Sequence, residues 1–257
     1  MRIKLGLQPE RYPAAFPLDN HLWAAAIYQA LRTADASYAD FLHGSGYRNP
    51  TGSHATKGLK PFVFARPYVP NMAIRGEQLW CHGGIVQWQI GSPIAPFLTT
   101  LEQGLRAQGG LEVGATRLVL TQLERLAPPD FTSPMRFTAL SPLMVDGTPA
   151  GAKNKHFVRA GDERFAALIA TNLREKHRIL FGTEATATPF HFAFDAEYVA
   201  QRGGLERCSK LAHYKGLHIK SYLAPFVVQG GLELIQLGWA GGFGNGNSQG
   251  FGMAGGA

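Results

Sequence analysis

The sequence has little of what several common classes of protein require. Its 257 residues include two cysteines, Cys81 and Cys208, which are too far apart to match a redox motif or a metal-binding motif. A disulfide-built secreted domain is therefore excluded, and a reducing, cytoplasmic location is expected. No apolar run reaches the roughly 20 residues that a membrane-spanning helix needs, so no membrane partner is expected.

Acidic residues are also sparse. The sequence has 18 Asp and Glu residues against 25 Lys and Arg residues, which gives a formal net charge of +7. No acidic cluster and no set of Cys and His residues has the spacing of metal ligands, so neither a metal nor another cofactor is expected. The excess of positive charge favours a polyanionic partner, and nucleic acid is the simplest one.

Glycine, in contrast, is abundant and is densest near the C-terminus, where residues 240–253 read AGGFGNGNSQGFGM. Because glycine adopts positive φ and lets a backbone come close to a ligand, we expect the N–H groups of this loop to face a bulky anion such as a phosphate backbone. The loop is neither a P-loop nor a dinucleotide fingerprint, since no strand-turn-helix unit and no Lys-Ser/Thr pair accompany it. A flexible tail of low complexity is the alternative interpretation.

Basic residues are concentrated in two stretches, residues 153–159 and residues 210–222. Basic side chains neutralise phosphates, and the aromatic residues between them can stack on unpaired bases, so both stretches indicate RNA, although solvated surfaces are the alternative. The residues predicted to contact phosphates are Lys153, Lys155, Arg159, Lys210, Lys215 and Lys220. The loop residues predicted to contact RNA are Gly242, Gly244, Asn245, Asn247, Ser248, Gly250 and Gly252.

Hydrophobic periodicity and helix-capping signals predict two similar halves. In the first half we expect strands at 1–8, 60–68, 78–90 and 111–126, with Gly83 and Gly84 suggesting a bulge or turn inside the third of them. We expect helices at 20–32, 35–43 and 96–108, with Gly44 in the left-handed position that ends the second helix. In the second half we expect strands at 137–145, 190–194, 212–219, 224–229 and around Phe251, a helix at 162–180, and an element at 232–239 that periodicity does not assign to helix or strand.

Both halves follow the order β-α-β-β-α-β. The predicted fold class is therefore α+β, with two tandem ferredoxin-like domains over residues 1–127 and 134–257 and a glycine-rich loop at the C-terminal end. The run Pro128-Pro129-Asp130 is expected to lie in the linker between them.

Short segments along most of the chain resemble one known family. They are PLDNH at 17–21, AAIYQAL at 25–31, FLHG at 41–44, KPFVF at 60–64, TALSPL at 138–143 and the C-terminal GFGNGNSQGFGM. Their order and spacing are similar to those of the CRISPR-associated endoribonucleases that cut repeat RNA into guide RNAs, within the repeat-associated mysterious protein (RAMP) superfamily. The resemblance implies a metal-independent endoribonuclease that cleaves by 2′-hydroxyl attack, leaves 2′,3′-cyclic phosphate and 5′-hydroxyl ends, and keeps its product bound.

The resemblance also implies three catalytic residues. It places the catalytic histidine at His43, where an imidazole can exchange a proton near neutral pH and a helix C-terminus favours its charged form. Tyr28 matches the position whose phenol assists the histidine. Lys60 matches the lysine that stabilises charge in the transition state, although Lys57 competes for this role and His54 could share the proton transfer.

Two other functions stay open. The chain could be a non-catalytic RNA-binding subunit of a CRISPR effector complex, but His43 and Tyr28 together argue against that role. It could also be an unrelated module for single-stranded RNA, but no strand carries the aromatic pattern that such a sheet would need. The expected partners are CRISPR repeat RNA and, in an effector complex, other protein subunits.

Overall fold

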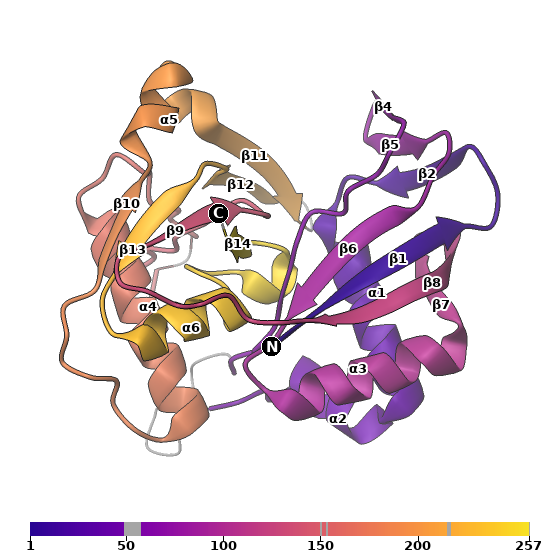
Figure 1. The fold of residues 1–257 in the computed structure, drawn as a ribbon, viewed down its shortest axis with the longest axis horizontal. Helices are drawn as coiled ribbons and strands as arrows, with labels where there is room; N and C mark the ends of the chain where they lie inside the picture. The colour runs from indigo at the N-terminus through magenta and orange to yellow at the C-terminus, as the bar shows by residue number, and fades with distance from the viewer. Residues whose placement is uncertain (49–57, 150, 153, 215–216, 257) are drawn as a thin grey trace.

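The computed structural model describes residues 1–48, 58–149, 151–152, 154–214 and 217–256 (Figure 1). The first half contains β1 (Arg2–Pro9), β2 (Ala14–Pro17), α1 (Asn20–Ala34), α2 (Ala36–His43), β3 (Val63–Phe64), β4 (Met72–Arg75), β5 (Gln78–Cys81), β6 (Val86–Gly91), α3 (Ala95–Gln108), β7 (Gly110–Val113) and β8 (Thr116–Leu126). The second half contains β9 (Met135–Ala139), α4 (Arg164–Phe181), β10 (His191–Phe194), α5 (Ala196–Gln201), the short 3-10 helix η1 (Leu205–Cys208), β11 (Ser209–Tyr214), β12 (Leu217–Tyr222), β13 (Phe226–Gln229), α6 (Leu232–Gly241), η2 (Asn247–Gln249) and β14 (Ala254–Gly256).

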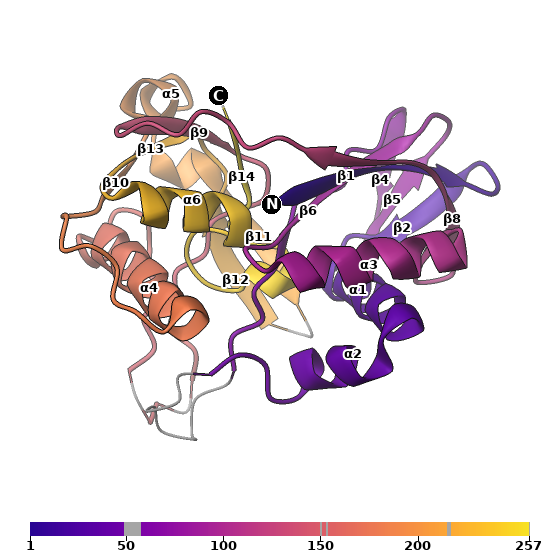
Figure 2. The same ribbon diagram turned by 60° about the horizontal axis from the view of Figure 1, so that its bottom comes forward.

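Each half is built on an antiparallel sheet with the same strand order. The first sheet is ordered β3-β6-β1-β8-β7 and the second β10-β13-β9-β14. The first and third strands of each β-α-β-β-α-β unit are central and antiparallel to each other. They are β1 and β6 in the first sheet and β9 and β13 in the second. Helices α1 and α3 lie on one side of the first sheet, and α4 and α6 lie on one side of the second (Figure 2). The predicted fold class of two tandem ferredoxin-like domains is confirmed.

Alternation of apolar residues explains the central strand of the first half. Ile3, Leu5 and Leu7 of β1 point to one face and are completely buried in the core under the helices. Helix α1 packs against α3 so closely that a Cβ atom on Gly104 would lie 1.7 Å from the carbonyl oxygen of Ala30. Two helices can approach to this distance only where one of them carries no side chain.

Several elements differ from the sequence-based expectations because turns interrupt them. The expected strand 78–90 is divided by the turn at Gly83 and Gly84 into β5 and β6, and the expected strand 212–219 is a hairpin of β11 and β12. Residues 232–241 form a helix. The sequence also gave no sign of β2 and β4, which flank β5 in a small separate sheet.

The expected left-handed conformation at Gly44 is wrong. Gly44 has a φ of −82°, and its N–H donates to the carbonyl of Asp40 as the last bond of α2. The chain turns two residues later, where Gly46 has a φ of 58° and its N–H donates to the carbonyl oxygen of Phe41 at 2.7 Å.

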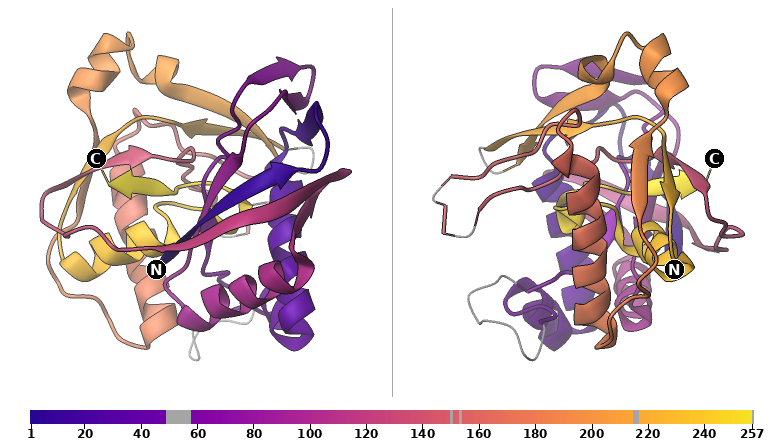
Figure 3. Two further views of the ribbon diagram at one scale, coloured as in Figure 1. Left: turned by 45° about the vertical axis from the view of Figure 1, so that its right-hand side comes forward. Right: turned by 90° about the vertical axis from the view of Figure 1, so that its left-hand side faces the viewer.

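The two halves are joined through a buried cation. The Arg2 side chain of β1 is 2% exposed, its guanidinium lies 4.1 Å from the ring centroid of Trp239 in α6, and its Nε donates to the Trp239 carbonyl at 3.2 Å. Burial lowers the pKa of Arg2 to about 9. Figure 3 shows α6 beside the start of β1, at the joint between the halves. None of the helices in the described part of the chain is long and apolar enough to span a membrane.

Candidate functional site

The three residues predicted to be catalytic come from three different elements and meet at one place. His43 is the last residue of α2, Tyr28 lies in the middle of α1, and Lys60 precedes β3. The ring centroids of Tyr28 and His43 are 5.5 Å apart, with the rings at 84° to each other. We call Tyr28, His43 and Lys60 the candidate trio.

Lys60 contacts both other members of the candidate trio. Its Nζ donates a hydrogen bond of 3.0 Å to the carbonyl oxygen of His43 and lies 5.7 Å from the centroid of the Tyr28 ring. Because that carbonyl is at the negative end of α2, the contact is favourable for a cation. The alternative candidates Lys57 and His54 lie outside the described residues.

Buried aromatic rings fix the position of the candidate trio. Phe62, two residues after Lys60, is completely buried and stacks on Phe97 of α3 with centroids 4.8 Å apart. The Tyr28 ring packs edge-on against Phe62 at 5.8 Å, so both Tyr28 and the chain next to Lys60 rest on the same buried ring. His43, in contrast, is exposed and open to a substrate.

The C-terminal glycine-rich segment, here called the glycine loop (residues 242–252), is mostly buried between the halves. Its two aromatic residues, Phe243 and Phe251, are completely buried. Gly252 has a φ of 79°, and a Cβ atom on it would lie 2.0 Å from the Phe243 carbonyl oxygen. Glycine is thus required there by the close contact of the loop with itself.

The expectation that the N–H groups of the glycine loop face an anion is wrong for most of them. The N–H of Gly242 donates to Gly238, that of Asn245 to Met144, that of Gly250 to Asn247, and that of Gly252 to Pro142, each to a carbonyl oxygen at 2.8–3.0 Å. Gly242, Gly244, Asn247, Gly250 and Gly252 are buried, and Asn245 and Ser248 are partly exposed. Contact between these residues and RNA stays a prediction, and only the partly exposed ones can reach it without a rearrangement.

The glycine loop is connected to the beginning of α1. The side-chain Nδ2 of Asn20, the first residue of α1, donates to the carbonyl oxygens of Gln249 at 3.1 Å and Gly250 at 3.4 Å. A Cβ on Gly250 would lie 2.6 Å from the ring of Phe64 in β3. The loop therefore contacts two of the elements that carry or adjoin the candidate trio.

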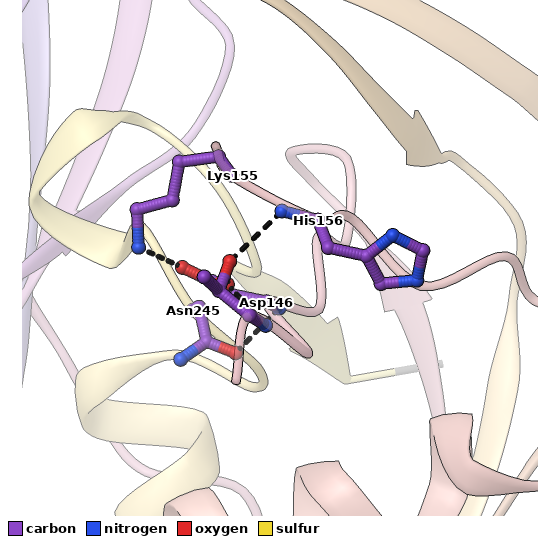
Figure 4. A network of polar contacts seen from close by, with 5 residues as sticks. Asp146, Lys155, His156 and Asn245 are labelled. Atoms are coloured by element: carbon purple, nitrogen blue, oxygen red, sulfur yellow. Dashed lines mark hydrogen bonds and ion pairs between the residues drawn. The ribbon is translucent and has the colours of Figure 1, made fainter. Parts of the chain in front are cut away.

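The predicted basic residue Lys155 belongs to a polar network beside the glycine loop (Figure 4). Its Nζ lies 2.5 Å from Oδ2 of Asp146, whose backbone N–H donates to Oδ1 of Asn245 at 3.0 Å. Burial raises the pKa of the Asp146 carboxyl, but hydrogen bonds from Lys155 and Thr148 outweigh it, so this pKa lies below its ordinary value. The His156 ring points away from this network, while the backbone N–H of His156 donates to Oγ1 of Thr148.

Two of the other basic residues, Lys220 and Arg159, interact with Glu206. The Nζ of Lys220 lies 2.6 Å from the Glu206 carboxylate, and this hydrogen bond is the main cause of a lowered pKa at Glu206, with the charge of Arg159 adding to it. Arg159 and Lys210 are exposed. Lys153 and Lys215 lie outside the described residues, and RNA contact by any of these residues stays a prediction.

Sequence reasoning missed one buried residue that the glycine loop depends on. Lys176 lies near the C-terminal end of α4, where the neighbouring His177 and Arg178 make it look like an ordinary basic residue that favours a helix end. In the structure the Lys176 side chain is only 5% exposed and reaches into the glycine loop. Its burial depends on packing against residues more than 60 positions later, which no local pattern reveals.

The candidate trio does not line the cavity of about 530 Å³ that opens between α4, α6 and the linker. That cavity is lined by Phe131, Phe181 and Trp239 among others. Among the described residues, no group of three or more His, Cys, Asp and Glu side chains is placed to hold a metal ion.

The chain combines two tandem ferredoxin-like domains with a glycine-rich loop near the C-terminal end. The family described as "CRISPR associated protein Cas6, C-terminal" matches residues 126–255, half of the chain. The chain therefore belongs to the Cas6 family.

Similar proteins match the chain over almost its whole length. The chain is 25% identical over 263 residues to "CRISPR-associated endoribonuclease Cas6 1" of Methanocaldococcus jannaschii, covering 98% of this chain and 91% of the relative. A solved structure of a "CRISPR associated protein Cas6" is 23% identical with a TM-score of 0.77, covering 100% of this chain and 99% of the other. A second, "An RAMP protein binding different RNA substrates", is 17% identical with a TM-score of 0.78, covering 99% and 98%.

Proposed function

We propose that this protein is an endoribonuclease that cleaves CRISPR repeat RNA into guide RNA without a metal ion and then holds its product. The observation that carries this proposal is the meeting of Tyr28, His43 and Lys60 from α1, α2 and the segment before β3, with 3.0 Å between the Lys60 Nζ and the His43 carbonyl oxygen. An exposed imidazole beside an ammonium group and a phenol suits the cleavage of a phosphodiester.

The reaction assigned to this site is an internal transfer. The 2′-oxygen before the scissile phosphate forms a bond to phosphorus, and the bond from phosphorus to the 5′-oxygen breaks. The proton of the 2′-hydroxyl passes to water, and His43 in its charged form donates a proton to the departing 5′-oxygen. The products are a 2′,3′-cyclic phosphate and a 5′-hydroxyl.

Lys60 and Tyr28 have supporting parts in this reaction. The Lys60 ammonium, held at the end of α2, neutralises the additional negative charge of the phosphorane-like transition state. The Tyr28 phenol is a weak base at neutral pH, and its part is to orient the 2′-oxygen or the phosphate by hydrogen bonding. Basic residues of the second half contact the phosphates of the bound RNA; among the described residues these are Lys155, Arg159, Lys210 and Lys220.

The test is incubation of the purified protein with labelled repeat RNA in excess EDTA, in parallel with the His43→Ala variant. The proposal expects one cut by the parent protein, ending in a 2′,3′-cyclic phosphate, and no cut by the variant. His82→Ala is the matched control. His82 is also exposed, but it follows β5, and β5 lies far from α2 (Figure 1).

Other outcomes would contradict the proposal in different ways. Equal cleavage by the parent and the His43→Ala variant would remove His43 from the reaction. Tight binding of repeat RNA without any cut would indicate a non-catalytic subunit of an effector complex. Cleavage that stops in EDTA and returns with added magnesium would contradict the metal-independent route.

A further inference from the structure

Lys176 of α4 is a buried cation whose hydrogen bonds all go to the glycine loop. Its Nζ donates to the carbonyl oxygen of Gly242 at 2.9 Å, to that of Gly244 at 2.8 Å and to Oδ1 of Asn247 at 2.7 Å. An ammonium group has three N–H donors, so these three acceptors use all of them. Burial lowers the pKa of Lys176 to about 7, opposed by the charge of Glu175 on the same helix. A buried charge held only by neutral oxygens is costly, so its presence here calls for an explanation.

Asn247 extends the contacts of Lys176 to both ends of the glycine loop. While its Oδ1 accepts from Lys176, its Nδ2 donates to the carbonyl oxygens of Phe243 at 3.3 Å and Phe251 at 3.0 Å. One ammonium and one amide together connect the two Gly-Phe-Gly triplets. The conformation of the whole loop thus depends on a side chain that the loop itself does not supply.

The same loop contacts the elements that position the candidate trio. Asn20, at the first turn of the helix that carries Tyr28, donates to the Gln249 carbonyl. Gly250 lies against Phe64, four residues after Lys60. A displacement of the loop would therefore reach both α1 and the segment before β3.

We propose that Lys176 is a positioning residue for RNA cleavage, because it holds the glycine loop in the one conformation that aligns α1 and β3 and so aligns the candidate trio with the scissile phosphate. This inference rests on the proposed endoribonuclease function. Lys176 itself does not touch the substrate. It acts through Asn247 and the loop backbone.

The first test replaces Lys176 with methionine, which has a similar length but no donor. Three buried acceptors then lose their partner, and the loop relaxes to satisfy them elsewhere. A misplacement of about 1 Å at a catalytic site can reduce a rate by about a hundredfold, so we expect the single-turnover rate at saturating RNA to fall by about 10- to 100-fold. The affinity for repeat RNA is expected to fall much less, because Lys155, Arg159, Lys210 and Lys220 are unchanged.

Arg178→Met is the matched control. Arg178 is a basic residue on the same helix, two positions later, but its side chain is exposed and its ion pair with Glu184 is long, at 4.0 Å. Its replacement should leave the cleavage rate unchanged. Hydrogen exchange of the peptide that covers residues 242–252 gives a second readout, which should become faster in Lys176→Met and stay unchanged in Arg178→Met.

Rescue distinguishes positioning from a general loss of structure. In a background where the two buried cysteines are alanine, Lys176→Cys can be alkylated with 2-bromoethylamine while unfolded, which restores an ammonium at the length of lysine, and then refolded. The proposal expects the alkylated protein to regain cleavage and loop protection and the unmodified cysteine variant to lack both. If variants at position 176 do not fold, Asn20→Ala removes the two hydrogen bonds from the Asn20 side chain to the loop, and cleavage is expected to slow several-fold with unchanged RNA affinity.

The outcomes separate this inference from the proposed function. Normal cleavage by Lys176→Met, or an equal loss in Arg178→Met, overturns the role of Lys176 while the endoribonuclease stands. If the variants at position 176 do not fold, normal cleavage by Asn20→Ala does the same. Absence of cleavage by the parent protein overturns the proposed function itself, and with it any role of Lys176 in the reaction, and this result is visible before any variant is compared.

Discussion

The candidate trio and the glycine loop are neighbouring regions built in opposite ways. The trio places His43 on the exposed end of a short helix, and the contacts within the trio include one hydrogen bond and two ring contacts. The glycine loop is buried, and its backbone is bonded to α4, to α1 and to the segment at 142–146. Under the proposed function, the difference is a division of labour, in which the exposed region would perform the chemistry and the buried region would hold the two halves in register. Substitutions in the first should change rates, and substitutions in the second should change stability as well.

The largest effect is expected from His43→Ala. General acid catalysis contributes about 100- to 10,000-fold to a rate, so the cleavage rate should fall by that amount. Because His43 is exposed, the free energy of unfolding should change by about 0.5 kcal/mol or less. Single-turnover cleavage and urea unfolding of the same preparation check both parts. A large loss of stability would contradict the contrast between the two regions.

Gly252→Ala should show the opposite behaviour. A φ of 79° is unfavourable for alanine, and the added Cβ would meet the Phe243 carbonyl oxygen at 2.0 Å. We expect a loss of about 3–5 kcal/mol in the free energy of unfolding, which is at the upper end for one substitution. Gly76→Ala is the control, since Gly76 has a similar φ of 59° but open space around its Cβ position. Equal losses in both variants would show that φ alone, and not the close contact of the loop, is responsible.

Lys60→Met tests the charge within the candidate trio. Removal of one group that stabilises a transition-state charge costs about 100- to 1000-fold in rate, and we expect a loss in that range. The RNA affinity should change little, because one phosphate contact among several is removed. Measurement of the rate at saturating RNA separates the two effects. A variant that cleaves normally would favour Lys57 as the residue that stabilises the charge.

A further expected effect is a dependence of stability on pH in the buried region. The folded-state pKa of Lys176 is about 7, below its ordinary value of 10.5. Between these two values the unfolded chain binds a proton that the folded protein does not, so the free energy of unfolding rises with pH in this window. The free energy of unfolding of the parent protein, minus that of Lys176→Met, should therefore increase from about pH 7 to about pH 10. A difference that stays constant or decreases over this window would show that the Lys176 ammonium remains charged in the folded protein.

The architecture could be predicted from the sequence because most strands and helices carry the usual hydrophobic periodicity and most helices carry the usual capping residues. The candidate trio could be predicted only through resemblance, since nothing local distinguishes His43 from the other eight histidines. The glycine loop was recognised, but its orientation was not, because the same composition suits an open anion-binding loop and a buried junction. The partners that decide between them, Lys176 and Asn20, are far away in the sequence. Only tertiary packing brings them to the loop.

The contact between α1 and α3 has a practical consequence for engineering. Replacement of a helical glycine by alanine is a standard way to make a protein more resistant to heat, because it restricts the unfolded chain. At Gly104 the added methyl group would collide with the backbone of α1 at Ala30, only two residues from Tyr28. A thermostabilisation programme that treats position 104 as a routine helix site would displace the Tyr28 phenol of the candidate trio, so this glycine should be exempted from such a library.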